Sequence, residues 1–460
     1  MTHKIAIIGA GFSGAATATQ LLTRYGDKPL GITLINRHAN LARGVAYGTH
    51  SPSHLLNVPA GRMSLFPDRE NDFLEFARGL DSSITASSFV PRSLYGRYLG
   101  ARLRQAVDNA PRARLEPLTG EVVDLKLASG GQQARLQLAD GSALTVERVV
   151  LAVGNYPPAD PSVPDAAFFK SPQYVRDPWA PGALDGQPLE QPLLLLGTGL
   201  TMMDVALELA RRGFSSTLFA LSRRGLLPQA HRELSAMPTE NALPADLMRG
   251  PASTRRYLRT LRRHIRTLAA QGTDWRDVIG SLRLVTPALW QALDLAERRR
   301  FLRHAQPYWD THRHRTAPAA AAQLEALRHS GRLMVRAGRL QHVNANRGQV
   351  EATWQPRNSS VYRRLSIAAV INCTGPQSAL EKLPDPLIRS LLDQGLLTPD
   401  PLGLGLETDA EGALLDNAGH PSGVMYYTGP LLKARDWECT AVPELRLAAL
   451  RLADRLAGAW

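Results

Sequence analysis

The chain has 460 residues, of which 44% are hydrophobic and 21% are charged, a globular composition that excludes a disordered chain and a coiled coil. At roughly 100–200 residues per domain, this length corresponds to about two to four folding units. No apolar stretch approaches the roughly 20 residues of a membrane span, which excludes an integral membrane protein. The net charge of +13 would suit an anionic partner, but the arginines are spread along the chain without a nucleic-acid motif, so we expect neither a nucleic-acid nor a membrane partner.

Cysteine usage bears on location and redox chemistry. The chain has two cysteines, Cys373 and Cys439, too few for a disulfide framework, which predicts a reducing and therefore cytoplasmic location. They lie far apart in the sequence and Cys373 falls within a buried-strand pattern, so we expect no redox-active thiol pair.

The hydrophobic pattern predicts two separate βαβ units. The first has a strand, a helix and a strand at 5–8, 14–25 and 32–35, and the second has them at 193–196, 201–212 and 217–221. Between the units we expect helices at 71–78 and 92–107, an antiparallel meander over 122–146, a strand at 149–153 and a proline-rich connection over 159–191. Beyond them we expect an arginine-rich, mainly helical segment over 244–330, strands within 333–354 and at 368–373, and a long amphipathic helix after Pro443.

A glycine-rich turn follows the first predicted strand. Residues 9–14 match the pattern GxGxxG, in which the first glycine makes the tight turn, the second admits a pyrophosphate and the third lets helix and strand pack closely. The phosphates would then lie at the positive end of the helix. The cofactor-binding residues predicted here are Gly9, Gly11, Phe12, Ser13 and Gly14.

The end of the next strand departs from this pattern. A carboxylate that accepts the ribose hydroxyl groups is expected near position 36, where the chain has Asn36 and then Arg37. An amide can still hydrogen-bond a ribose, so we keep both residues among the predicted cofactor contacts.

A second turn of this kind opens the second βαβ unit. Gly197, Gly199 and Thr201 are its predicted cofactor-binding residues, and Met202 replaces the third glycine, which predicts a wider helix–strand spacing. An ordinary glycine-rich turn is the alternative. The following strand leads into Ser222, Arg223 and Arg224, and the cations favour NADPH over NADH because they can bind the 2′-phosphate. Asp204 is expected to favour the dipole of the helix.

Two dinucleotide folds in one chain predict FAD together with a nicotinamide that reduces it. Without a thiol pair, dioxygen is a natural electron acceptor, through a flavin hydroperoxide that needs a dry pocket. Two alternatives stay open. One is an NAD(P)H-dependent flavin reductase or dehydrogenase with another acceptor, and the other is a nucleotide-binding sensor without turnover.

The sequence resembles, over essentially its whole length, the bacterial FAD/NAD(P)-binding proteins that are often labelled hydroxyacylglutathione hydrolases. The segments that carry the resemblance are 9–14, 44–47, 54–60, 222–228, 308–315 and 437–445. The metal-binding histidine cluster of such hydrolases is absent from the sequence. Characterised relatives are flavin N-monooxygenases of amino acids such as aspartate, and the resemblance therefore implies NADPH- and O₂-dependent oxygenation of an amino acid or small amine.

The resemblance also implies positions for the cofactors. Asn57 and Val58 would approach the flavin, Gly154 and Gly375 would lie at the strand ends that connect the two nucleotide domains, and Gly429 and Thr440 would cover the pyrimidine edge of the flavin. Helix N-terminal amides near Thr440 would stabilise negative charge on the reduced flavin.

No side-chain acid or base is required by this scheme, so we name no catalytic residue. Arg62, Arg92 and Arg232 are candidates for binding a substrate carboxylate. His312 and His314 are spaced unsuitably for a metal site, and we expect the run 312–315 to be a basic surface facing an anion or a solvated helix face. The basic helix at 255–266 is expected to pack through Leu258, Leu261 and Ile265 rather than to lie on a membrane.

The predicted fold class is α/β, with two Rossmann-like dinucleotide-binding domains, for FAD and NADPH, and helical insertions. We expect residues 1–185 and 346–460 to form the FAD-binding domain, and 186–345 to form the NAD(P)H-binding domain with its helical insertion at about 244–330. The expected partners are O₂ and a small-molecule substrate. The sequence does not fix the oligomeric state.

Overall fold

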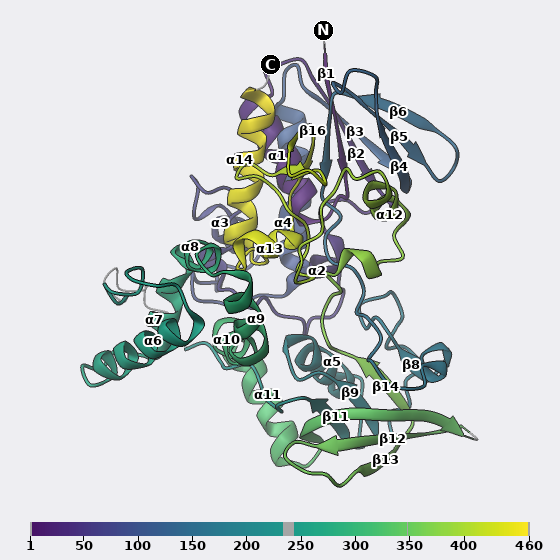
Figure 1. Cartoon of the computed structure of the whole chain (residues 1–460), viewed down its shortest axis with the longest axis vertical. Helices are drawn as coiled ribbons and strands as arrows, with labels where there is room; N and C mark the ends of the chain where they lie inside the picture. Colours follow the sequence, from purple (N-terminus) through teal and green to yellow (C-terminus); the bar gives the residue numbers. More distant parts are fainter. Residues whose placement is uncertain (1, 233–242, 347, 459–460) are drawn as a thin grey trace.

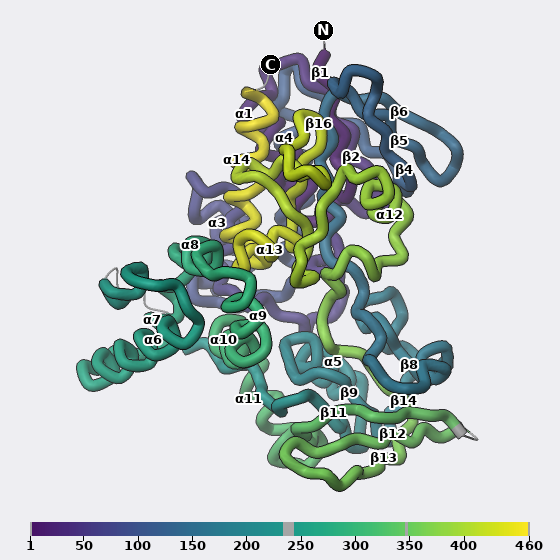
Figure 2. Tube along the Cα trace, viewed as in Figure 1, coloured from purple at the N-terminus to yellow at the C-terminus, as the bar shows by residue number. Residues whose placement is uncertain are grey.

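The computed structural model describes residues 2–232, 243–346 and 348–458. Figure 1 shows an upper unit that holds both chain termini, a lower unit built on a second sheet, and a group of helices that projects to the left between them. Figure 2 traces how the chain passes from the upper unit into the lower one and back.

The first βαβ unit lies at the centre of a six-stranded sheet. Strands β1 and β2 pair in parallel, as do β1 and β7, so the first predicted unit is confirmed. The strand order is β15-β16-β7-β1-β2-β3, with bounds His3–Ile8 for β1, Leu30–Asn36 for β2, Arg114–Thr119 for β3, Arg148–Leu151 for β7, Ala413–Leu415 for β15 and Pro421–Tyr427 for β16.

Alternate side chains of this sheet enter two different cores. Ile5 and Ile7 face helices α1 (Phe12–Tyr25), α4 (Arg92–Asn109) and α14 (Val442–Gly458). Ala6 and Ile8 face the other core, which includes the small antiparallel sheet β4-β5-β6 and helix α12. The bounds on this side are Val122–Leu127 for β4, Ala134–Leu138 for β5, Ala143–Val146 for β6 and Pro386–Asp393 for α12.

The second sheet has seven strands in the order β13-β12-β11-β10-β9-β14-β8. Strands β8 to β11 and β14 pair in parallel, and β11, β12 and β13 continue the sheet as an antiparallel extension. The bounds are Tyr174–Val175 for β8, Leu193–Leu196 for β9, Leu218–Ser222 for β10, Leu333–Asn346 for β11, Gln349–Pro356 for β12, Arg363–Ile367 for β13 and Ala369–Asn372 for β14. Helices α5 (Leu200–Arg211) and α11 (Pro318–His329) cover one face.

The second sheet takes strands from both sides of the expected domain boundaries. Strands β12, β13 and β14 belong to the second sheet although they follow residue 345, and β8 belongs to it although it precedes residue 186. The reason is that the antiparallel extension continues past the predicted limit, and β14 then returns beside β9 before the chain re-enters the first unit.

The projecting helices are α6 (Thr254–Ala269), α7 (Trp275–Ser281), α8 (Thr286–Gln291), α9 (Leu295–His304) and α10 (Gln306–Arg313), and we call them the helical insertion. Leu261 and Ile265 of α6 pack with α7, whereas Leu258 is absent from that cluster, so the predicted packing of this helix is confirmed in part. Trp290 attaches α8 to the first unit by packing against Trp437, with 4.7 Å between ring centroids, and by donating its indole N–H to Ala434 O at 2.9 Å.

Three shorter helices complete the architecture, namely α2 (Gly44–Tyr47), α3 (Asp72–Arg78) and α13 (Lys433–Asp436). Helices α2 and α3 both contact α4 in the first unit. Within the described residues, none of the helices combines the length and apolarity needed to cross a bilayer.

Candidate functional site

The first glycine turn is built so that helix α1 starts almost in contact with strand β1. Gly9 has φ 106°, and a Cβ there would lie 2.3 Å from the carbonyl oxygen of Ala152. A Cβ on Gly14 would lie 1.9 Å from the carbonyl oxygen of Gly9. Only glycine fits at either position. Helix α1 has no acidic residue in its first turn, so its N-terminal amide groups can receive a phosphate.

Asn36 holds the shape of this turn. Its Oδ1 accepts a hydrogen bond from Ala10 N at 3.3 Å, and its Nδ2 donates to the carbonyls of His38 at 2.6 Å and Asn40 at 3.2 Å. Arg37 beside it forms ion pairs with Asp385 at 2.8 Å and Glu121 at 3.0 Å. The structure therefore gives both residues partners within the protein, which the sequence did not reveal.

The C-terminal part of the first unit leaves a buried hydroxyl group without a partner. Thr428 is 1% exposed, and its Oγ1 has no hydrogen-bond partner in the structure. Gly429 follows with φ 142°, and Thr440 lies just before helix α14. Gly154, at the end of the neighbouring β7, has φ 72° and open space where a Cβ would point. A buried hydroxyl group without a partner, and a glycine that faces open space, are consistent with a site for a polar ligand such as a flavin.

The second glycine turn repeats the first in the second sheet. Gly197 has φ 105°, and a Cβ there would lie 2.4 Å from the carbonyl oxygen of Cys373. Gly199 and Gly375 both face open space. The Oγ1 of Thr198 lies 2.8 Å from the Oγ of Ser222 and donates to Leu226 O at 2.6 Å, which fastens the turn to the end of β10.

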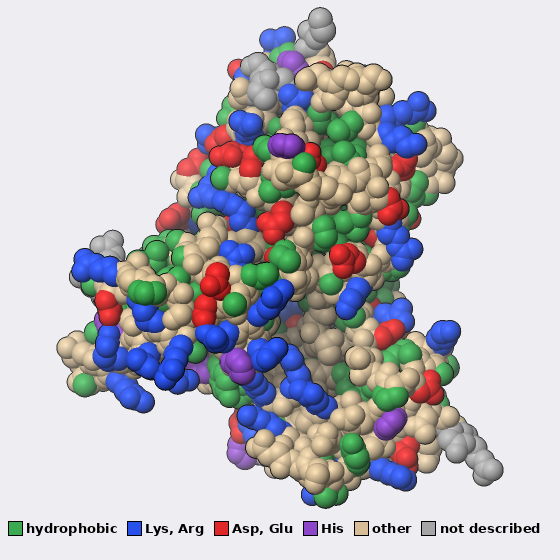
Figure 3. All heavy atoms as spheres, viewed as in Figure 1, with side chains coloured by type: hydrophobic (Ala, Val, Ile, Leu, Met, Phe, Trp, Pro, Cys, Tyr) green, Lys and Arg blue, Asp and Glu red, His purple; other side chains and the backbone are tan. Residues whose placement is uncertain are grey.

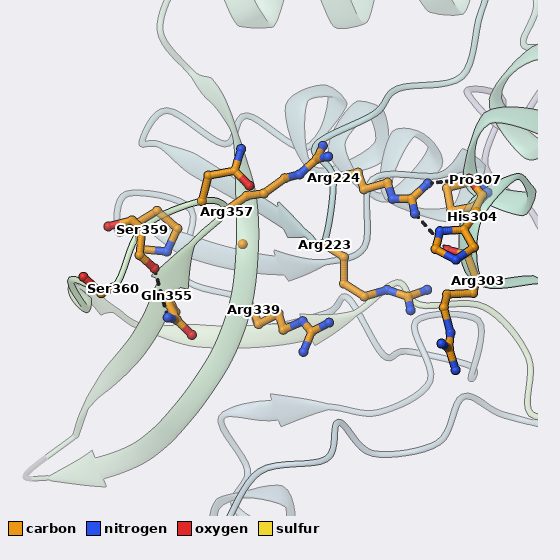
Figure 4. Close-up of a pocket in the computed structure, with 13 residues that line it drawn as sticks. Arg223, Arg224, Arg303, His304, Pro307, Arg339, Gln355, Arg357, Ser359 and Ser360 are labelled. Atoms are coloured by element: carbon orange, nitrogen blue, oxygen red, sulfur yellow. Dashed lines mark hydrogen bonds between the residues drawn. The ribbon is translucent and has the colours of Figure 1, made fainter.

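A basic cavity of about 680 Å³ lies beside the end of β10. Figure 4 shows its side chains converging from β10, from the β11–β12 hairpin and from the end of α9. The basic residues that line it are Arg223, Arg224, Arg303, His304, Arg339 and Arg357. The sequence predicted only the first two of the arginines, because the others come from segments that the fold brings together.

The three predicted substrate arginines do not lie together. Arg92 forms an ion pair with Asp204 at 2.7 Å, with side-chain exposures of 15% and 13%, and its Nε donates to Leu55 O at 3.0 Å. Arg232 forms an ion pair with Asp277. Burial, followed by the charges of Arg283 and Arg313, lowers the pKa of Arg62.

These neighbours define a basic cluster, consisting of Arg62, His231, Arg283, Arg313 and Arg315. Burial, followed by the charges of Arg313 and Arg276, lowers the pKa of Arg315 to about 10. Burial, followed by the charge of Arg315, lowers the pKa of His231 to about 4, and its Nε2 lies 3.0 Å from Asn57 O. Burial is the main cause of these lowered pKa values and the neighbouring arginines add to it, and the Asn57 contact joins the cluster to the segment expected near the flavin.

Carboxylates from helix α14 and the segment before it border the cluster. Burial alone would raise the pKa of Glu438, but His314 and Arg313 outweigh it and lower that pKa to about 2. Glu444 pairs with Arg283, with an Nη2 to Oε2 distance of 2.8 Å. The residues of the run 312–315 thus have different surroundings. Arg313 and Arg315 belong to the basic cluster, whereas the ring of His312 packs against that of Trp275, with 5.0 Å between ring centroids. In the described part of the chain, no group of three metal-ligating side chains is placed to hold an ion.

Comparison with known proteins agrees with this geometry. Residues 6–156 match a family described as FAD-NAD(P)-binding. An L-aspartate N-monooxygenase (nitrosuccinate-forming) from Streptomyces davaonensis is 28% identical over 341 residues, which covers 60% of this chain. One from Streptomyces cremeus is 33% identical over 165 residues, or 34% of this chain. The chain is related to flavin-dependent amino-acid N-monooxygenases.

The matched regions make up 50% and 23% of the lengths of these two relatives, so the chain spans at most about half of each. Among solved structures, L-lysine 6-monooxygenase from Pseudomonas syringae superposes with a TM-score of 0.68 at 18% identity, covering 100% of both chains. The likeness confirms the predicted α/β fold with two dinucleotide-binding domains. The family match confirms that the first turn belongs to an FAD- and NAD(P)-binding fold.

Proposed function

We propose that this protein is an NADPH- and O₂-dependent flavin monooxygenase that oxygenates the amino group of an acidic amino acid. The observation that carries the proposal is the basic cluster, whose arginines are partly buried and whose His231 contacts the Asn57 segment. The aspartate N-monooxygenases among the relatives support the same reaction class.

The residues of the two glycine turns fit the two nucleotides. Gly9 and Gly14 let helix α1 begin against β1, so that its N-terminal amide groups can hold the FAD pyrophosphate near Gly11, and Thr428 offers a hydroxyl group without a partner among the described residues where the pyrimidine edge of the flavin is expected. Gly199 and Gly375 leave the corresponding space for NADPH. When bound, the flavin supplies hydride acceptance from NADPH and the activation of O₂.

The basic cluster determines which substrate is bound. Arg62 and Arg315 can each engage a carboxylate in a bidentate manner, and a substrate with two carboxylates would compensate the charge that lowers their pKa values. The same cations disfavour a further positive charge, so they lower the pKa of the substrate ammonium group. The cluster would therefore favour the neutral amine, which is the nucleophilic form, without a side-chain base.

Burial of both cysteines argues against a thiol electron acceptor. Cys373 and Cys439 are buried and free, and burial raises the pKa of both thiols. A thiol that stays protonated is a poor nucleophile. Two free thiols also support the proposed cytoplasmic location.

The proposal is tested by supplying the FAD-loaded protein with NADPH, isotopically labelled O₂ and a panel of amino acids. Aspartate or glutamate should stimulate NADPH consumption and yield a product that carries labelled oxygen on nitrogen, and lysine should not. NADPH consumption without an oxygenated product would favour the flavin reductase. Absence of flavin reduction by NADPH would favour the sensor.

A further inference from the structure

The sequence motif after β10 predicts two basic residues, Arg223 and Arg224, but the cavity beside β10 is lined by further ones. Five arginines and one histidine line it, and none of the described lining residues is acidic. Arg223 follows β10 directly, at the strand end where the adenosine ribose of a dinucleotide bound to this turn is expected. The cavity is thus placed to receive a phosphate on that ribose.

Arg224 also lines the cavity, but its guanidinium already has partners within the protein. Its Nη2 donates to Arg303 O at 2.8 Å and its Nη1 to His304 O at 3.1 Å, and its guanidinium lies over the ring of Tyr308 at 5.1 Å. Arg303 and His304 are the last two residues of α9, so Arg224 neutralises the negative end of that helix. Figure 4 shows these bonds as dashed lines from Arg224 to the end of α9.

Arg339 is brought to the cavity by strand pairing. Strand β11 runs parallel to β10 with Ala337 opposite Ser222, so Arg339 projects beyond the same strand end as Arg223. Both side chains are exposed, and within the described parts of the chain neither forms an ion pair. Figure 4 shows both side chains beside the cavity, Arg223 from the end of β10 and Arg339 from β11. Two arginines that line one cavity, without an ion pair to a described residue, suit a dianionic phosphate.

We propose that Arg223 and Arg339 bind the 2′-phosphate of NADPH, and that Arg224 is a positioning residue that holds the end of α9 against the nucleotide site. The inference rests on the proposed use of NADPH. It reassigns one of the two arginines of the sequence motif and adds a residue more than a hundred positions away. Because α9 leads into α10, which carries Arg313, Arg224 also links the nucleotide site to the basic cluster.

The test uses the full-length, FAD-loaded protein and measures binding by calorimetry, with adenosine 2′,5′-bisphosphate and AMP as probes. Arg223→Ala and Arg339→Ala should each weaken binding of the bisphosphate by about tenfold or more, because each removes a charge-assisted contact, while AMP binding changes less than about twofold. Arg339→Gln repeats the test with a long uncharged side chain. Arg135→Ala is the matched control, since it removes an exposed arginine from β5 in the first unit and should change neither affinity.

Arg224→Ala separates the positioning role from a ligand role. It should retain bisphosphate affinity within about threefold, because the two binding arginines remain, and it should raise amide hydrogen exchange over residues 295–313, which Arg223→Ala should not do.

Three outcomes would count against the proposal, and they differ in what they overturn. Equal affinity of the unmodified protein for the bisphosphate and AMP would contradict the use of NADPH itself. Preference for the bisphosphate that survives Arg339→Ala would overturn only the assignment of Arg339. Loss of that preference in Arg224→Ala to the same extent as in Arg223→Ala would overturn the positioning role.

Discussion

The two glycine turns share one design and differ at one position. Gly9 and Gly197 have nearly the same φ, 106° and 105°, and each lies against the carbonyl at the end of a neighbouring strand. At the third motif position the first turn has Gly14, which touches the backbone of Gly9, and the second has Met202, which is 0% exposed. Helix α1 is therefore packed on backbone, and helix α5 is packed through a side chain.

The difference shows what fixes the helix against the sheet at each glycine turn. The first turn depends on a backbone contact that tolerates no substitution, and it lies between two extensive cores. In the second turn, the side chain of Met202 fills the space between helix α5 and the sheet. Basic side chains from the surrounding segments line the cavity beside this turn. Figure 3 shows Lys and Arg side chains gathered over the helical insertion and beside the hollow next to it.

The largest effect is expected at the first turn. Gly14→Ala places a Cβ 1.9 Å from a backbone oxygen, so it should destabilise the protein by more than about 4 kcal/mol and prevent FAD binding. Urea unfolding and the flavin content of the purified protein measure the two effects. Gly199→Ala is the matched control, because its Cβ meets open space, and it should leave stability and bound FAD unchanged. Retention of FAD by Gly14→Ala would show that the close contact is not required.

Met202→Gly tests whether the side chain of Met202 sets the spacing between helix and strand at the second turn. It restores the sequence pattern but leaves a cavity where a buried side chain stood, so we expect a loss of about 3 kcal/mol in the free energy of unfolding. Met202→Leu preserves the volume and should cost less than about 1.5 kcal/mol. If Met202→Gly were as stable as the unmodified protein, the spacing of helix and strand would not depend on Met202.

The ion pair between Arg92 and Asp204 joins the two units at the start of helix α4 and near the start of α5. Asp204→Asn leaves the half-buried guanidinium without a counter-charge and should lower the free energy of unfolding by about 2 kcal/mol. Arg263→Ala, which removes an exposed pair with Asp246, should cost less than about 0.5 kcal/mol. Similar values for the two variants would mean that the contact between the units contributes little.

The smallest effect is a pH dependence at the basic cluster. The pKa of His231 falls to about 4 in the folded protein, whereas the unfolded chain binds a proton near pH 6.5, so protonation favours the unfolded state between these values. Stability should therefore decrease as pH falls from 6.5 to about 4, by about 1–3 kcal/mol from this group. His231→Gln should flatten that part of the profile, and His38→Gln, an exposed control, should not. An unchanged profile in His231→Gln would contradict the neutral histidine.

The sequence was sufficient to predict the local features of the fold. Both glycine turns, the meander and the long C-terminal helix follow from glycine spacing and hydrophobic period, and the structure contains them. These features depend on residues that are close in the chain, so their pattern is visible in one segment.

Contacts between distant segments could not be predicted in this way. Arg92 was expected to bind substrate and Asp204 to favour a helix dipole, yet they pair with each other across the two units. Arg339 reaches the cavity only because β11 lies beside β10, and Arg62 meets Arg283 and Arg313 only because the helical insertion folds back on the first unit. These contacts join residues that are far apart in the sequence, so no pattern within one segment predicts them.

The central claim is that one chain holds FAD and NADPH in adjoining sites, and that electrons from NADPH pass through the flavin to O₂, so that one oxygen atom is transferred to the nitrogen of an acidic amino acid and the other is released as water. The most direct measurement follows flavin absorbance under nitrogen and then identifies the product after labelled O₂ is admitted. We predict that NADPH bleaches the flavin much faster than NADH does, and that with aspartate or glutamate present the labelled oxygen appears on nitrogen. A flavin that stays oxidised with NADPH, or one that is reduced and reoxidised without any labelled product, would contradict the account.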